Sequence, residues 1–191
     1  MKETVTPMPD SSDRAKDKRS GPKGIGMAVA FDWGLAVQIL SMPLLSLLTG
    51  KPGFFNLHQG PAMTALISFV AALPFAALFA LFGEGVRRGW RWTLPIQIIF
   101  NTLGFIAGIA GLLNLYQSIR QGVYWSIVTS VILLIFSPLI AWRLSRPETR
   151  RWFATITSAV ARRRHGGMWP IYIALWALVG GTLQALATLF R

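Results

Sequence analysis

The chain has 191 residues, of which 53% are apolar and only 14% are charged, against about 25% charged residues in an average soluble protein. The apolar residues gather in long uncharged stretches and the mean hydropathy is +0.49, which favours lipid as the solvent for most of the chain. This composition excludes a disordered chain. The absence of cysteine excludes disulfide scaffolds, thiol nucleophiles and thiolate metal sites.

The first 24 residues form a polar segment that contains three prolines and six of the Lys and Arg residues. Such a segment has too few apolar side chains to form a core. We therefore predict a disordered, basic N-terminal arm over residues 1–24.

Five later stretches have the roughly 20 apolar residues that a helix needs to cross a bilayer. Four contain no charged residue and lie at about 61–82, 93–116, 122–142 and 169–190. The earliest stretch, at about 25–48, is equally apolar apart from Asp32. The sequence thus predicts an all-α, polytopic transmembrane helix bundle with five spans over residues 25–191.

The basic residues alternate between the segments that separate these spans. From the N-terminal arm to the C-terminus, the successive segments hold six, one, three, one, seven and one Lys or Arg residues. Assigned to the two membrane faces, the counts are sixteen and three. Cytoplasmic segments are enriched in Lys and Arg, so we expect a cytoplasmic N-terminus and an external C-terminus. The same bias accounts for the net charge of +12 without a nucleic-acid partner.

Asp32 is the one acidic residue inside a predicted span, and it allows two interpretations. A carboxylate in hydrocarbon costs about 2.5–3.5 kcal/mol on insertion scales and often marks an ion or proton pathway. If Asp32 lies deep, Gln97 and Asn101 of the third span are available partners, and the three residues form a candidate intramembrane polar site. If Asp32 lies at the interface, beside Phe31 and Trp33, it is an N-cap with a structural role.

Small and polar residues recur at spacings of three and four in the predicted spans, so they share one face of a helix. In the third span they are Gln97, Asn101, Gly104, Gly108 and Gly111, and in the fifth they include Gly181 and Gln184. In lipid, such faces let helices approach closely. We therefore predict helix packing at Gly104, Gly108, Gly111, Gly181 and Gln184, either within one chain or between copies.

The loop before the last span predicts an additional cytoplasmic, amphipathic helix over about 146–163. Ser145-Arg146-Pro147-Glu148 fits a capping box. An apolar stripe follows at Trp152, Phe153, Ile156, Ala159 and Val160. This helix lies either in the membrane interface or against the rim of the bundle. In the first case its arginines contact anionic headgroups; they are Arg150, Arg151, Arg162, Arg163 and Arg164.

The segment 144–153, Leu-Ser-Arg-Pro-Glu-Thr-Arg-Arg-Trp-Phe, resembles a short tail found after a transmembrane helix in small, uncharacterised bacterial multi-span membrane proteins. The shared pattern is Arg-Pro-Glu, one residue, Lys or Arg, one residue, an aromatic residue and Phe. The resemblance covers about residues 61–153. It implies a bacterial inner-membrane location and carries over no catalytic residues.

The residues that favour chemistry are sparse. His58 and His165 fall in loops on opposite predicted faces, and no Ser or Thr of a span has a basic partner there. We therefore expect no catalytic residues, no metal site and no cofactor.

The favoured hypothesis is a non-enzymatic packing or accessory subunit of a membrane assembly, whose partners are the bilayer, anionic headgroups, other copies or a larger complex. The alternative is a small, oligomeric, proton- or solute-coupled transporter or channel that uses Asp32. A membrane enzyme lacks the acidic or histidine cluster that it would need.

Overall fold

The computed structural model describes residues 22, 24–50 and 61–190, and all regular secondary structure in these residues is helical. Five helical segments are long and apolar enough to span a membrane. They are α2 (Ile25–Thr49), α3 (Pro61–Arg87), α4 (Thr93–Ala110), the segment Ser126–Ser145 and α10 (Trp169–Leu189). The prediction of an all-α, five-span membrane bundle is confirmed. The predicted arm lies almost wholly outside the described residues, apart from Pro22 and Gly24.

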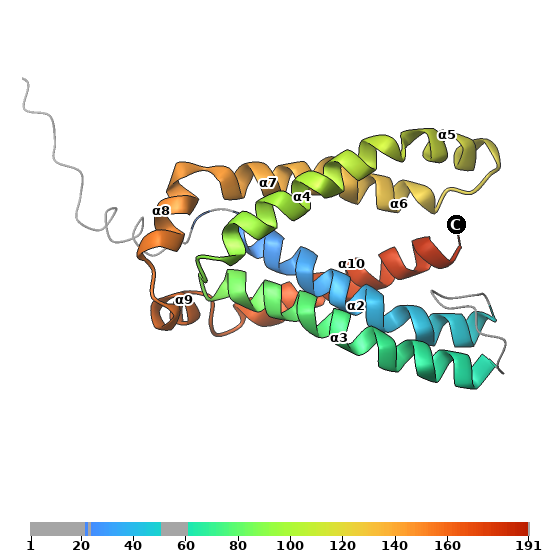
Figure 1. Cartoon of the computed structure of the whole chain (residues 1–191), viewed down its shortest axis with the longest axis horizontal. Coiled ribbons are helices and arrows are strands. Elements are labelled where there is room, and N and C mark those ends of the chain that lie inside the picture. The colour runs from blue at the N-terminus through green and yellow to red at the C-terminus, as the bar shows by residue number, and fades with distance from the viewer. Residues whose placement is uncertain (1–21, 23, 51–60, 191) are drawn as a thin grey trace, which may run out of the picture.

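The helices form two groups (Figure 1). In the first group, α2 packs along α3 on one side and along α10 on the other. In the second, α4 and α5 (Leu112–Arg120) pair with the Ser126–Ser145 segment, which comprises α6 (Ser126–Val131), the π-helical turn η1 (Ile132–Phe136) and α7 (Ser137–Ser145). Contact between the groups is limited, mainly between α6 and α10, α3 and α4, and α2 and α7.

The short helices α8 (Pro147–Thr155) and α9 (Ser158–Arg164) lie together at one end of the bundle, where α2 begins (Figure 1). The last helix, α10, ends at the opposite end. An odd number of spans separates the start of α2 from the end of α10, as the alternation of basic residues predicts.

Two spans are less regular than the sequence predicts. The predicted helix 93–116 is interrupted at Gly111, which separates α4 from α5. The predicted span 122–142 begins later, at Ser126, and contains the π-helical turn just before Pro138. Proline has no amide hydrogen and its ring crowds the carbonyl four residues earlier, so a wider turn at this position accommodates the ring.

The single amphipathic helix predicted over 146–163 is wrong, because residues Ile156 and Thr157 are extended and separate α8 from α9. β-branched residues at 155–157 disfavour a continuous helix there, and the Thr157 side chain instead caps α9 by accepting from the Val160 amide. The predicted capping box is also absent. Ser145 is the last residue of α7, where its hydroxyl donates to the Ala141 carbonyl at 2.7 Å, and the N-cap position of α8 is occupied by Arg146, which makes no side-chain cap hydrogen bond.

The end with α8 and α9 holds the largest buried apolar side chains of the described residues. Trp152 and Phe153 of α8 join a core cluster with Ile25 of α2, Val86 of α3 and Leu144 of α7. The interpretation that this segment packs on the rim of the bundle therefore holds for α8. The predicted stripe fails in α9, where the break shifts the helical phase. There Ala159 and Val160 are exposed and Ala161 is buried.

The predicted packing glycines lie against neighbouring helices of the same chain. A Cβ atom on Gly108 would lie 2.8 Å from the Leu133 Cβ, and one on Gly104 would lie 3.2 Å from the Ser137 hydroxyl. A Cβ atom on Gly181 would collide with the Gly34 carbonyl of α2. These contacts place α4 against η1 and α7, and α10 against α2.

The other two predicted packing residues have different surroundings. A Cβ atom on Gly111 would approach carbonyl oxygens of its own helix, the nearest at 3.3 Å. Gln184 is half-buried on α10, and its Oε1 has no hydrogen-bond partner among the described residues. Gly111 is therefore the site of the helix interruption rather than of a close helix crossing.

Neighbouring glycines of α10 provide a test of this packing. Gly181→Ala should lower the free energy of unfolding by about 1–3 kcal/mol, because the added methyl group meets the backbone of α2. Gly180→Ala is the control, since a Cβ atom at Gly180 has no neighbour within 4 Å and alanine favours a helix by about 1 kcal/mol. Thermal unfolding in detergent measures both variants. Equal stability of the two would contradict the close crossing of α2 and α10.

Candidate functional site

Asp32 lies inside α2, seven residues after its first residue, which is about 10 Å along the helix. It is 1% exposed. The residue that precedes the helix and occupies the N-cap position is Gly24. The interpretation of Asp32 as an interfacial N-cap is therefore wrong, because α2 begins two turns earlier than that interpretation requires.

The three residues of the predicted polar site lie together in the structure. The Gln97 amide Nε2 donates to Oδ2 of Asp32. The Asn101 amide Nδ2 donates to Oε1 of Gln97 at 3.0 Å and to the Gln97 carbonyl at 2.9 Å. Because Asp32 belongs to α2 and the two amides belong to α4, this chain of hydrogen bonds joins the two helix groups.

Gly83 lets α3 cover the site closely. A Cβ atom on Gly83 would lie 3.2 Å from the Asp32 Cβ and 2.6 Å from Nε1 of Trp33. All three site residues are at most 2% exposed. In lipid such an enclosure matters, because a buried polar group that lacks a partner costs several kcal/mol.

The chemistry of the site follows from the atoms that still lack partners. Oδ1 of Asp32 and Oδ1 of Asn101 are buried and have no hydrogen-bond partner among the described residues. Asp32 also forms no ion pair with a described basic residue. Both unpaired atoms are oxygens, so the site can accept a proton, a hydrogen-bond donor or a small cation.

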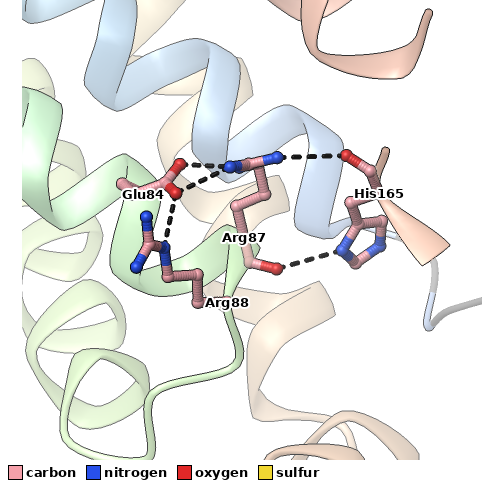
Figure 2. Close-up of polar contacts among 4 residues, drawn as sticks. All are labelled: Glu84, Arg87, Arg88 and His165. Carbon is pink, nitrogen blue, oxygen red and sulfur yellow. Dashed lines mark hydrogen bonds and ion pairs between the residues drawn. The ribbon is translucent and has the colours of Figure 1, made fainter. Parts of the chain in front are cut away.

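A second polar cluster lies at the end with α8 and α9 and is shown in Figure 2. The Glu84 carboxylate accepts from Arg87 at 2.6 and 2.7 Å and from Arg88 at 2.5 Å. Arg87 also donates to the His165 carbonyl at 3.2 Å, and Nδ1 of His165 lies 3.1 Å from the Arg87 carbonyl. These paired contacts fasten the end of α3 to the turn between α9 and α10.

His165 is enclosed by aromatic rings. Its ring centroid lies 4.7 Å from that of Trp169 and 5.8 Å from that of Trp152, and the residue is 6% exposed. Burial lowers the pKa of the imidazole, and the charges of Arg87 and Arg164 lower it further, against the opposing effect of the hydrogen bond to the Arg87 carbonyl. The folded protein therefore favours neutral His165.

Most of the arginines lie at this same end. Of the eleven arginines in the described residues, ten belong to the end of α3, the turn before α4, the end of α7, or α8 and α9 (Figure 1). The five predicted to contact anionic lipid are all exposed; they are Arg150, Arg151, Arg162, Arg163 and Arg164. Their contact with headgroups stays a prediction.

Comparison of the chain with family models, curated proteins and solved structures finds no match. The resemblance of residues 144–153 to a bacterial membrane-protein tail therefore stays a prediction. Sequence reasoning missed the contact of Arg87 with His165, since 78 positions separate them.

Removal of one partner tests the coupling within the polar site. Gln97→Leu should lower the free energy of unfolding by about 1–3 kcal/mol, because the Asp32 carboxyl loses its donor in a buried place. In the double variant Asp32→Ala/Gln97→Leu, the loss of unfolding free energy should be about 1 kcal/mol smaller than the sum of the losses in the two single variants. Chemical unfolding in detergent measures the cycle, and Gln117→Leu on the exposed face of α5 is the control. Strict additivity would refute the contact.

The lowered pKa of His165 predicts a pH dependence of stability. Below about pH 6.5 the unfolded state binds a proton that the folded state resists, so the free energy of unfolding should fall with pH by at most about 1.4 kcal/mol per unit. Above pH 6.5 this contribution should be constant. The measurement is thermal stability against pH in a His58→Gln background, where His165 is the one histidine left. If His165→Gln in that background leaves the slope unchanged, the assignment is wrong.

Proposed function

We propose that this protein is a small proton- or solute-coupled membrane transporter, in which Asp32, Gln97 and Asn101 form the coupling site. One observation supports the proposal above all others. A carboxyl group buried within a span has no basic partner among the described residues and bonds to an amide of the other helix group. Ionisable residues inside spans are costly and usually functional.

The position of the site suggests how coupling would work. The two helix groups contact each other sparingly, so they can move as separate units at moderate cost. An ionised Asp32 only accepts hydrogen bonds, and a protonated Asp32 also donates one. Because both unpaired oxygens of the site are acceptors, proton uptake supplies the missing donor and changes how the groups are joined.

The proposal places the protein in the inner membrane of a bacterium, with the N-terminus in the cytoplasm and the C-terminus outside. The concentration of arginines at the end with α8 and α9 supports this orientation. There the exposed arginines would contact anionic headgroups, each contributing about 1 kcal/mol.

A second candidate function is a non-enzymatic accessory subunit of a membrane assembly. Its supporting observation is the enclosure of the polar site, where Gly83 of α3 lies close to Asp32 and Trp33 of α2. Under this hypothesis the Asp32–Gln97 hydrogen bond only fixes the arrangement of the two helix groups. Loss of the Asp32 charge would then leave any flux unchanged.

Asp32→Asn distinguishes the two functions, because it keeps the size of the side chain and removes the titratable group. Purified protein in vesicles is given a pH gradient and the low-molecular-weight fraction of a bacterial lysate, and internal pH is followed with a fluorescent dye. The transporter proposal predicts wild-type flux above that of protein-free vesicles and a fall close to that level in the variant. Gln117→Asn serves as the matched control. Equal flux in wild type and Asp32→Asn would overturn the proposal.

A further inference from the structure

A pocket of about 330 Å³ lies between α4–α5 and α6, away from the Asp32 site. Its walls include Gly108, Gly111, Asn114, Ser126 and Ser130. The volume corresponds to roughly ten water molecules in the liquid, and it falls at the lower end of the range for small-molecule sites.

One polar group in this wall is buried without a partner. Ser126 is 4% exposed, and its hydroxyl has no hydrogen-bond partner among the described residues. The adjacent Ser130 hydroxyl donates to the Ser126 carbonyl at 3.0 Å, which leaves the Ser130 oxygen as an acceptor. The wall therefore presents both a donor and acceptors to an occupant.

The backbone is irregular on both sides of the pocket. The interruption at Gly111 lies in one wall, and Leu133 of the π-helical turn lies in the other. Irregular backbone within a membrane is tolerated where it is buried or lines a polar cavity, and single π turns occur often at functional sites.

The lining also limits the kind of ligand. The described residues that line the pocket are all uncharged, and they combine hydroxyl and amide groups with aliphatic side chains such as Leu115 and Leu133. An ion would be left without a counter-charge. A neutral molecule with hydroxyl groups matches these walls.

The pocket and the Asp32 site lie along the same face of the α4 helix. Asn101, Gly104, Gly108 and Gly111 follow one another at spacings of three and four. Between the two places this face packs against α7, because a Cβ atom on Gly104 would lie 3.2 Å from the Ser137 hydroxyl. Residues of α5 and α6 line the pocket, and these two helices lie toward the end of the bundle opposite α8 and α9 (Figure 1).

We propose that this pocket binds a small uncharged molecule with adjacent hydroxyl groups, such as a free polyol or the glycerol part of a neutral lipid. The further statement that this ligand is the solute coupled to proton movement at Asp32 rests on the proposed function. The statement that the pocket binds the ligand rests only on the residues that line it.

The absence of cysteine from the chain permits a direct test by thiol labelling. Ser126→Cys is reacted with a hydrophilic methanethiosulfonate in vesicles of phosphatidylcholine, with glycerol, monooleoylglycerol, acetate or choline as the probe. Glycerol or monooleoylglycerol should slow labelling by about threefold or more at saturating concentrations, and the two charged probes should not. Thr129→Cys, which also lines the pocket, is the second variant. Ser118→Cys on α5, outside the lining, is the control.

Protection by glycerol identifies a free polyol as the source of the ligand, and protection by monooleoylglycerol alone identifies a lipid. Equal slowing by the charged probes, slowing at Ser118→Cys as well, or no protection by either hydroxylated probe would overturn the binding site. Absence of labelling at both pocket positions would overturn it too. Protection should persist when Asp32→Asn is added. If it persists while Asp32→Asn leaves flux unchanged, the proposed function fails and the binding site stands.

Discussion

The hydrogen bond from Gln97 to Asp32 is the contact on which the arrangement of this bundle depends. A carboxyl group two turns inside α2 that is only 1% exposed is shielded from water, so a donor must come from a neighbouring helix. Gln97 supplies that donor from the second helix group, and Asn101 in turn holds the Gln97 amide. Gly83 allows α3 to lie closely over the Asp32 side chain. The small size of one glycine and the position of two amides thus make a buried carboxyl tolerable.

The two ends of the molecule differ in how tightly and how regularly their helices are packed. At the end with α8 and α9, the buried core cluster, the Glu84–Arg87 ion pair and the paired contacts with His165 fix the helices to one another. Toward the opposite end, α4 gives way to α5 at Gly111 and a pocket with a buried, unpaired hydroxyl opens beside it. Along α4, the polar site at Gln97 and Asn101 lies between this tightly packed end and the less regular part that contains Gly111.

Much of this architecture could be predicted from local patterns, because a helix in lipid must be long, apolar and internally hydrogen-bonded. The spacing of Gln97 and Asn101 correctly placed both amides on one face of α4 and made them available to Asp32. The choice between a buried and a capping Asp32 was open, since it depends on where α2 begins, and tertiary packing of Ile25 and Val29 determines that start. The capping box at Ser145 failed because Ser145 still belongs to α7, so that Arg146 and not Ser145 occupies the N-cap position of α8. The contact of Arg87 with His165 joins distant parts of the chain, which periodicity cannot reveal.

The most direct test of this account is the distance between the Asp32 carboxyl carbon and the Gln97 side-chain nitrogen in a bilayer. Solid-state NMR can measure it as carbon–nitrogen dipolar dephasing, with ¹³C in the carboxyl groups of aspartate and ¹⁵N in the side-chain amides of glutamine. The chain has four aspartates, Asp10, Asp13, Asp17 and Asp32, so the Asp32 carboxyl signal is assigned as the one that is lost in Asp32→Ala. The account predicts dephasing that corresponds to a separation under about 4 Å and its loss in Gln97→Leu. Dephasing that is absent from the wild type, or unchanged in that variant, would contradict it.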